Sequence, residues 1–208
     1  MDEKVIAAMA RWPGVPAVFG WLSLNERGQW RLHPAGDALA DEATADPCAR
    51  QGTSITSPQI LRFMNRNYAC DDAGRWYFQN GPQKVYVRLD AAPYVLSTGN
   101  PCHGGPSLHT HTGLQVGRVA SWWATDTGRL YAQTDLGPGL VAGRDLDAVF
   151  DALRSSDGRS LLDILDGLSP EAAPVMLEGP ASDACPLHLC SEADIPSRLG
   201  FVRFPRAD

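Results

Sequence analysis

The 208-residue chain has no concentrated positive charge. It contains 18 lysines and arginines against 24 aspartates and glutamates, its formal net charge is −6, and no run of basic residues occurs. Proteins that bind phosphate backbones need a clustered basic face. The sequence therefore excludes nucleic acid as a main partner.

Long apolar segments are also missing. No stretch approaches the roughly 18 apolar residues that a membrane-spanning helix needs. Residues 1–10 are acidic and amphipathic, without the basic and long apolar regions of a signal peptide. The five cysteines are odd in number and scattered, which favours free thiols in a reducing compartment. We expect a soluble, bacterial, cytoplasmic protein that does not contact membranes.

Common catalytic motifs are absent as well. The sequence has no phosphate-binding P-loop and no Gly-x-Ser-x-Gly nucleophile elbow. The glycines of residues 137–143 imitate a dinucleotide-binding loop, but the strand predicted before them, residues 129–134, is not the apolar run of a buried parallel strand. We interpret residues 137–143 as a connection between a strand and a helix. These absences argue against an enzyme.

Short segments bounded by turn residues predict a sheet. Asn80-Gly81 is typical of a hairpin turn because both residues tolerate positive φ, and residues 84–89 alternate as a half-buried strand does. Other strands are predicted at residues 17–24, 29–33, 75–79, 93–98, 114–124 and 129–134, with later ones at 174–177 and 200–204. The expected fold class is α+β, an antiparallel, meander-rich β-roll or partly open barrel with a few packed helices.

Four segments have helical patterns. The clearest is residues 144–153, where Leu146, Val149, Phe150 and Leu153 follow the spacing of a buried helix face. The other three are residues 2–11, 58–68 and 160–168, and a long surface loop is predicted over 34–56. We expect an N-terminal α+β subdomain over 1–98 and a C-terminal β-roll with helices over 99–208. One continuous domain is the alternative.

The stretch from 59 to 95 carries a further pattern. It consists of Ile60-Leu61-Arg62-Phe63, Asp71-Asp72-Ala73-Gly74-Arg75-Trp76-Tyr77, Gln83-Lys84-Val85-Tyr86-Val87 and Asp90-Ala91-Ala92-Pro93-Tyr94-Val95, with Arg27-Gly28-Gln29-Trp30 ahead of it. It resembles an uncharacterised proteobacterial family, a domain of unknown function. Members pair a small α+β N-terminal unit with a β-roll similar to pleckstrin-homology folds. The resemblance implies this fold but no activity and no catalytic residues.

One loop gathers residues that bind metals. Residues 100–113 contain Cys102, His103, His109 and His111. On an extended strand, His109 and His111 would point to the same face, and Cys102 or His103 would complete the site across a Gly-Gly-Pro bend. A fourth ligand would come from Cys185, His188 or Cys190, and zinc suits such mixed ligands best. The alternatives are a solvated polar loop and a histidine that acts in ligand binding or proton transfer.

Two further features of the sequence bear on function. A nucleophilic pair of Cys102 and His103 is disfavoured because adjacent side chains rarely point at each other. Trp122 and Trp123 must point to opposite faces of one strand, so one belongs to the core and the other is partly exposed.

Two functional hypotheses remain. The first is a non-enzymatic soluble module that binds an unknown protein or small ligand, with a homodimer as a further expectation. The alternative is a zinc-type metal-binding protein or metalloenzyme centred on residues 102–111.

Overall fold

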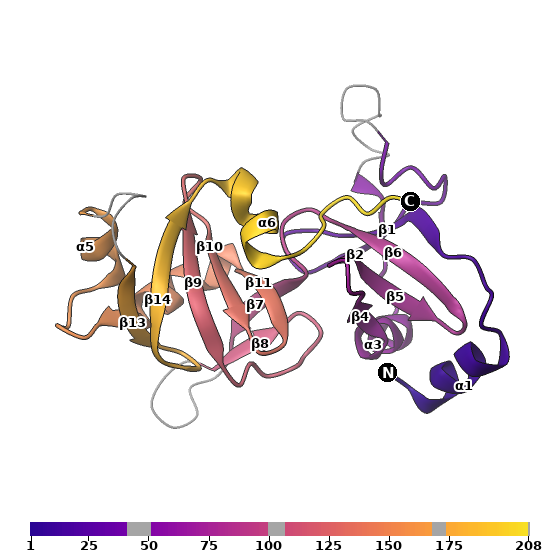
Figure 1. Cartoon of the computed structure of the whole chain (residues 1–208), viewed down its shortest axis with the longest axis horizontal. Coiled ribbons are helices and arrows are strands. Elements are labelled where there is room, and N and C mark those ends of the chain that lie inside the picture. The colour runs from indigo at the N-terminus through magenta and orange to yellow at the C-terminus, as the bar shows by residue number, and fades with distance from the viewer. Residues whose placement is uncertain (41–50, 100–106, 168–173, 208) are drawn as a thin grey trace. The chain divides into compact units, whose positions relative to one another are not determined.

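The computed structural model describes residues 1–40, 51–99, 107–167 and 174–207. The chain forms two compact units (Figure 1). Unit 1 comprises Met1–Ala91 with Gly200–Asp208, and unit 2 comprises Ala92–Leu199. The boundary expected from the sequence fell between 98 and 99, whereas contacts place 92–98 in unit 2 and return the last residues to unit 1.

In the described ranges 1–40 and 51–91, unit 1 is a six-stranded sheet with helices α1 and α3. Its elements are α1 (Glu3–Arg11), β1 (Val18–Leu24), β2 (Trp30–Leu32), β3 (Thr53–Ser54), α3 (Pro58–Arg66), β4 (Tyr68–Cys70), β5 (Trp76–Asn80) and β6 (Gln83–Leu89). The strand order is β3-β2-β1-β6-β5-β4. Neighbours are antiparallel except for β1 and β6, which are parallel.

The core of unit 1 lies between the sheet and α3. Phe63 of α3 packs edge-on against Phe78 of β5, with ring centroids 5.5 Å apart. Trp30 of β2 is buried and donates its indole N–H to Asn65 of α3 at 2.9 Å. α1 contributes only Val5 to the buried residues and is tied to the end of α3 by Asp2.

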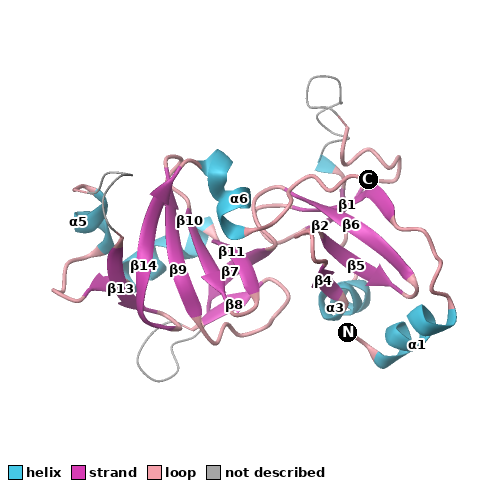
Figure 2. Cartoon of the chain, viewed as in Figure 1, coloured by secondary structure: helices cyan, strands magenta, loops and turns pink. Residues whose placement is uncertain are grey.

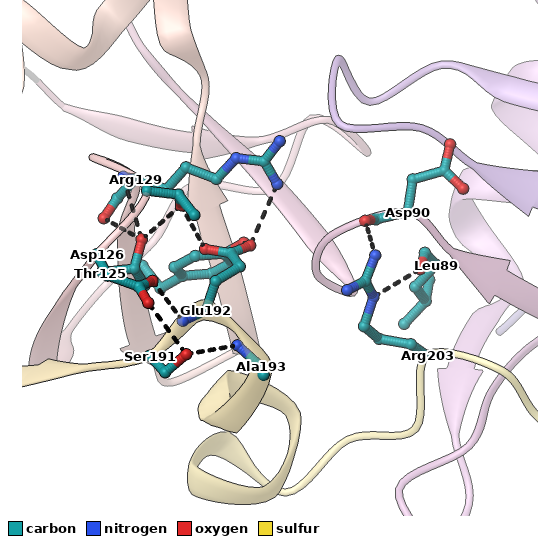
Figure 3. A network of polar contacts seen from close by, with 11 residues as sticks. Leu89, Asp90, Thr125, Asp126, Arg129, Ser191, Glu192, Ala193 and Arg203 are labelled. Carbon is teal, nitrogen blue, oxygen red and sulfur yellow. Dashed lines mark hydrogen bonds and ion pairs between the residues drawn. The ribbon is translucent and has the colours of Figure 1, made fainter.

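The last residues of the chain complete unit 1. Val202 forms a parallel bridge with Arg75. The backbone carbonyl of Arg203 accepts a hydrogen bond from the backbone N–H of Leu89. The Arg203 guanidinium donates hydrogen bonds to the carbonyls of Leu89 and Asp90 (Figure 3). A strand was predicted at 200–204, and the structure gives a single bridge in its place.

Unit 2 is an eight-stranded sheet with short helices (Figure 2). Its elements are β7 (Tyr94–Thr98), β8 (Leu108–Thr110), β9 (Val119–Thr125), β10 (Leu130–Thr134), β11 (Gly137–Val141), η1 (Gly143–Asp145), α4 (Leu146–Ala152), β12 (Arg154–Ser155), α5 (Leu161–Leu165), β13 (Val175–Gly179), β14 (Ser182–Cys190), η2 (Glu192–Asp194) and α6 (Ile195–Leu199). The strand order is β12-β13-β14-β9-β10-β11-β7-β8, and the sheet curls into a half-barrel.

The expected α+β class is confirmed, but the expectation of an antiparallel sheet is only partly right. Parallel pairs join β1 to β6, β11 to β7 and β14 to β9. Residues 137–141 are strand β11 between β10 and β7, so their interpretation as a strand-to-helix connection is wrong. The glycines there permit close packing: a Cβ on Gly139 would overlap the side chain of Leu96.

Most of the predicted hairpins and helices are present, with small shifts. The β5–β6 hairpin turns at Gly81-Pro82, since Asn80 already pairs with Gln83, and Gly81 takes a φ of +58°. Glycine at the first turn position with positive φ is typical of a type II′ turn. No helix in the described part of the chain is long and apolar enough to cross a bilayer.

Candidate functional site: an apolar groove in unit 1

Strand β1 carries a bulge that shapes the site. Val18 pairs with Val85, and Leu22 pairs with Val87, so β1 has two more residues than β6 over this interval. Val85 and Val87 share a face of the sheet, which places Val18 and Leu22 on that face as well. Trp21 lies within this bulge, and its side chain is 43% exposed.

Gly20 makes this bulge possible. Its φ is +80°, and a Cβ at this position would overlap the carbonyl oxygen of Gly36. Gly36 in turn lies against the indole of Trp21. A Cβ on Gly36 would be in ordinary van der Waals contact with that ring, 3.6 Å from it. The bulge therefore depends on glycine at position 20 for both backbone conformation and space.

Helix α3 covers only part of this sheet face. Nine residues make a helix about 14 Å long and about 10 Å wide, whereas six strands at about 4.8 Å spacing span about 24 Å between the outer strands. α3 packs over β5 and reaches Trp30 of β2, which leaves uncovered the part of the face around Trp21 and Leu32.

A groove of about 510 Å³ occupies the uncovered part. It is lined by Val18, Trp21, Leu22, Leu32, Ile55, Ile60, Met64, Phe78, Asn80, Gln83 and Val85. Nine of these residues are apolar, two are amides, and none of the described residues in the lining is charged. Trp21, Leu32 (40% exposed) and Ile60 (51% exposed) form an apolar rim. Exposed apolar patches of this kind mark binding surfaces.

The groove has a polar end and an apolar end. Asn80 and Gln83 lie together at the β5–β6 hairpin, where the Gln83 amide donates to the Pro16 carbonyl at 3.2 Å. Leu32 lies on β2, which is three strands from β5 in the sheet. Beside it is Ile55, whose backbone N–H donates a hydrogen bond to the Trp30 carbonyl. The amides therefore mark one end and aliphatic side chains mark the other.

The charged side chains of β6 belong to the opposite face of the sheet. Lys84 places its Nζ 4.6 Å from the ring centre of Tyr77, and Arg75 lies 5.0 Å from the ring centre of Tyr86. The Tyr86 hydroxyl donates to Asp71 at 2.8 Å. Burial would raise the pKa of Asp71, but hydrogen bonds from Arg75 and Tyr86 hold it below its usual value. Alternation along the strand keeps these charges out of the groove.

A serine, a histidine and an aspartate meet on that opposite side of β1. The Ser23 hydroxyl and His33 Nε2 are 2.8 Å apart, and His33 Nδ1 lies 3.7 Å from Asp37. Ser23 and His33 have no exposed surface. A hydrolytic nucleophile must reach its substrate, so the geometry supports a structural role for these residues.

Unit 2 has a second cavity, of about 540 Å³, beside a polar network (Figure 3). Glu192 receives hydrogen bonds from Arg129, Thr127 and Tyr131. Asp126 accepts the Glu192 backbone N–H and the Ser191 hydroxyl. These groups satisfy one another, which points to stabilisation of the β9–β10 turn.

The thiol at this second cavity is not activated. Cys190 lines it, and burial, with Asp194 nearby, raises the pKa of the thiol. A thiol that stays protonated is a poor nucleophile. The network therefore offers no catalytic constellation.

The predicted metal-binding loop is only partly described. Cys102 and His103 lie outside the described residues. His109 is in β8 opposite Ser97, with its ring over Gly99. His111 lies in the turn after β8, where Val95 donates its N–H to Nδ1 at 3.4 Å and the ring lies 5.8 Å from that of Tyr94. Burial lowers the pKa of His111 from 6.5 to about 3.

The other proposed ligands lie along β14. Cys185 is buried, and His188 stacks on Trp123 with ring centroids 4.3 Å apart. Burial, followed by the charge of Arg198, lowers the pKa of His188. Across the described ranges, no three His, Cys, Asp or Glu side chains gather as a metal ion requires. The site at His109, His111, His103 and Cys102 stays a prediction.

The opposite orientations of Trp122 and Trp123 are predictable from the sequence, and the groove is not. Trp122 is fully buried and Trp123 is half-buried, which confirms their opposite orientations. Ile60 lies in the helix predicted over 58–68, and half of its surface is exposed at the groove rim. An exposed tryptophan beside a glycine in a predicted strand, Gly20-Trp21, was the one local signal of the site.

Comparison with known proteins gives a family and two similar structures. The crystal structure of a DUF1285 family protein from Silicibacter pomeroyi DSS-3 matches with a TM-score of 0.49 and 17% identity, over 90% of this chain and 96% of that one. A DUF1285 family protein from Shewanella baltica OS155 matches with a TM-score of 0.40 and 17% identity, over 60% and 86%. None of the curated proteins matches the chain. The family model described as "Protein of unknown function (DUF2946)" matches residues 1–206, so the chain belongs to that family.

Proposed function

We propose that this protein is a non-enzymatic binding module that holds an apolar ligand in the groove of unit 1. The observation that carries the proposal is the exposed apolar rim of Trp21, Leu32 and Ile60 around a cavity of about 510 Å³. Small-molecule sites have volumes of about 300–1,000 Å³, apolar walls and a few polar groups. The groove has this size and composition.

The scaffold supports binding better than catalysis. The groove lining offers no charged, nucleophilic or acid–base side chain among the described residues. We also propose that unit 2 is a β-roll of the pleckstrin-homology type, a protein scaffold on which binding surfaces are built. Its curled sheet supports this assignment.

The test uses a fluorescent dye that brightens in apolar surroundings. Ile60→Glu places a charge at the rim on a side chain that is already half exposed, so the fold should persist. Leu162→Glu is the matched control, because Leu162 is an exposed leucine on helix α5 of unit 2. Dye binding should fall at least tenfold in Ile60→Glu and stay unchanged in Leu162→Glu. Equal dye binding by both variants would contradict the proposal.

A further inference from the structure

The turn between β5 and β6 joins an exposed asparagine to a glycine. Asn80 is the last residue of β5, and Gly81 follows it at the first turn position with a φ of +58°. We propose that Asn80-Gly81 is a site of slow covalent modification, at which the side-chain amide is lost as ammonia and water converts the residue to aspartate and isoaspartate. This inference stands apart from the proposed function, because it needs no ligand in the groove.

The reaction joins the backbone to the side chain. The backbone nitrogen of Gly81 loses its proton and attacks the side-chain carbonyl carbon of Asn80, so a C–N bond forms, and the side-chain nitrogen takes up a proton and leaves as ammonia. The product is a five-membered cyclic imide. Water then adds to one of the two ring carbonyls and breaks the bond from that carbon to the ring nitrogen. Cleavage on the side-chain side gives aspartate, cleavage on the backbone side gives isoaspartate, and no oxidant or reductant takes part.

The attacking nitrogen is accessible because residue 81 is glycine. Glycine has no Cβ to hinder the approach, and a Cβ built at this position would have no atom within 4 Å. Within the described residues, the Gly81 N–H donates no hydrogen bond. Its carbonyl, in contrast, accepts the Gln79 side-chain amide at 2.9 Å. The nitrogen can therefore lose its proton without breaking a contact of the hairpin.

The Asn80 side chain is equally available. It is exposed, and its amide has no hydrogen bond to any other described residue. It can therefore rotate towards the Gly81 nitrogen without giving up a partner. The backbone around it is fixed by the pairing of Asn80 with Gln83, which holds the two reacting groups at a tight turn.

The other asparagines lack this combination. Asn25, Asn65 and Asn67 each hold their side-chain amide in hydrogen bonds, and each is followed by a residue larger than glycine. Asn100 precedes a proline, whose nitrogen carries no proton to lose. Asn80 is the one asparagine in the sequence that a glycine follows. The chemistry therefore selects a single position.

The two products act differently on the hairpin. Aspartate keeps the backbone and adds a negative charge at a residue that lines the groove. Isoaspartate inserts one carbon into the backbone between residues 80 and 81, which shifts the pairing of Asn80 with Gln83. The shift also moves the Gly81 carbonyl away from Gln79, whose side chain is fully buried and makes no other hydrogen bond among the described residues. A buried amide that loses its partner is destabilising, so the isoaspartate form should unfold more easily.

The test follows the mass of the full native chain during incubation at pH 8 and 37 °C. Loss of ammonia and gain of water add about one mass unit, and fragmentation of the tryptic peptide 76–84 assigns the change to residue 80. This peptide should convert at least tenfold faster than the peptides that carry Asn25, Asn65 or Asn67, and it should give two products that separate by chromatography. Conversion should be slower at pH 6, because the attacking nitrogen must lose its proton.

The consequence for stability has its own measurement. Asn80→Asp reproduces the aspartate product with an unaltered backbone. Urea unfolding of the incubated chain should show a fraction with a lower midpoint than Asn80→Asp. A single transition at the midpoint of Asn80→Asp would show that no isoaspartate forms, and would overturn that half of the proposal.

Two variants separate this site from a general loss of amides. Asn80→Gln lengthens the side chain, so that attack must close a six-membered ring, and conversion at residue 80 should slow at least tenfold. Asn25→Gln, at another turn, is the matched control and should leave conversion of Asn80 unchanged. Equal rates in all asparagine-containing peptides would overturn the proposal. Conversion in urea but not in native buffer would overturn it as well, because it would show that the folded hairpin protects Asn80.

Discussion

The Ser23 hydroxyl and Nε2 of His33 form a fully buried hydrogen bond of 2.8 Å between β1 and the residue that follows β2. Asp37, 3.7 Å from the other ring nitrogen, extends the contact to the next loop. The bond joins the two strands on the side opposite the groove, so it supports the strand pair that carries Leu22 and Leu32.

Ser23→Ala should destabilise the protein by about 1–3 kcal/mol, because it removes one partner of a buried hydrogen bond. Urea unfolding monitored by tryptophan fluorescence measures this loss. Ser54→Ala, at an exposed position of β3, should change the free energy of unfolding by less than about 0.5 kcal/mol. Equal effects of the two substitutions would show that the Ser23–His33 bond contributes nothing.

Gly20→Ala should destabilise unit 1 by about 2 kcal/mol or more, because a positive φ and an overlap with the Gly36 carbonyl combine. Gly81→Ala also places a Cβ at a positive φ, but no atom lies within 4 Å of that Cβ. A loss of about 1 kcal/mol in the free energy of unfolding is therefore expected. Gly14→Ala has neither problem and should be nearly neutral. Thermal unfolding of the three variants should give this order, and a stable Gly20→Ala would contradict the bulge.

Glu192 should contribute stability that depends on pH. Burial would raise the pKa of its carboxyl, but hydrogen bonds from Tyr131, Thr125 and Thr127 and the charge of Arg129 lower it below 4.5. The folded state therefore favours the ionised form, and this stabilisation is present above pH 4.5 and lost as the pH falls through the folded-state pKa. Glu192→Gln should be destabilising at pH 7, and its deficit relative to the native chain should shrink towards pH 3. A constant deficit would contradict this coupling.

His111 should add a second, separate pH dependence. In the unfolded chain His111 takes up a proton near pH 6.5, whereas in the folded chain its buried imidazole has a pKa of about 3. The free energy of unfolding therefore decreases as the pH is lowered from about 6.5 to 3. Between pH 7 and pH 5 the loss amounts to about 2 kcal/mol. His111→Gln should remove this part of the pH dependence. In NMR spectra, the ring signals of His111 should not titrate above pH 4, and a midpoint near 6.5 would refute the burial argument.

The metal hypothesis makes a prediction of its own. If His109 and His111 hold zinc, protein purified without an affinity tag should contain one metal ion per chain by elemental analysis. The double substitution His109→Ala/His111→Ala should then remove it. Substoichiometric metal that does not change in the double variant would rule out the site.

The sequence predicted features that local chemistry determines. The turns between the strands predicted at 17–24 and 29–33 and at 114–124 and 129–134 follow from residues within a few positions of each other, as does the start of α3 at Pro58, and the structure has them. Strand β14 escaped prediction because Pro186 interrupts its pattern, and its pairing with β9 joins residues more than sixty positions apart. Such parallel pairings leave no turn signal in the sequence.

The groove was hidden for a related reason. Periodicity shows that Ile60 and Met64 belong to one side of α3, but it does not show how much of the sheet that helix covers. Met64 is buried and Ile60 is half exposed, a difference set by how the helix packs on the sheet and not by periodicity. The sequence therefore indicated a binding module without indicating where it binds.

The return of residues 200–207 to unit 1 has a consequence for biosynthesis. Unit 2 is one continuous segment, so it can reach its native contacts while the chain is still being extended. Unit 1 obtains the Val202 bridge and the Arg203 contacts only after unit 2 has been translated. The N-terminal unit is thus the later one to finish folding: its six strands are all made before residue 90, but the contacts of Val202 and Arg203 wait for the end of the chain.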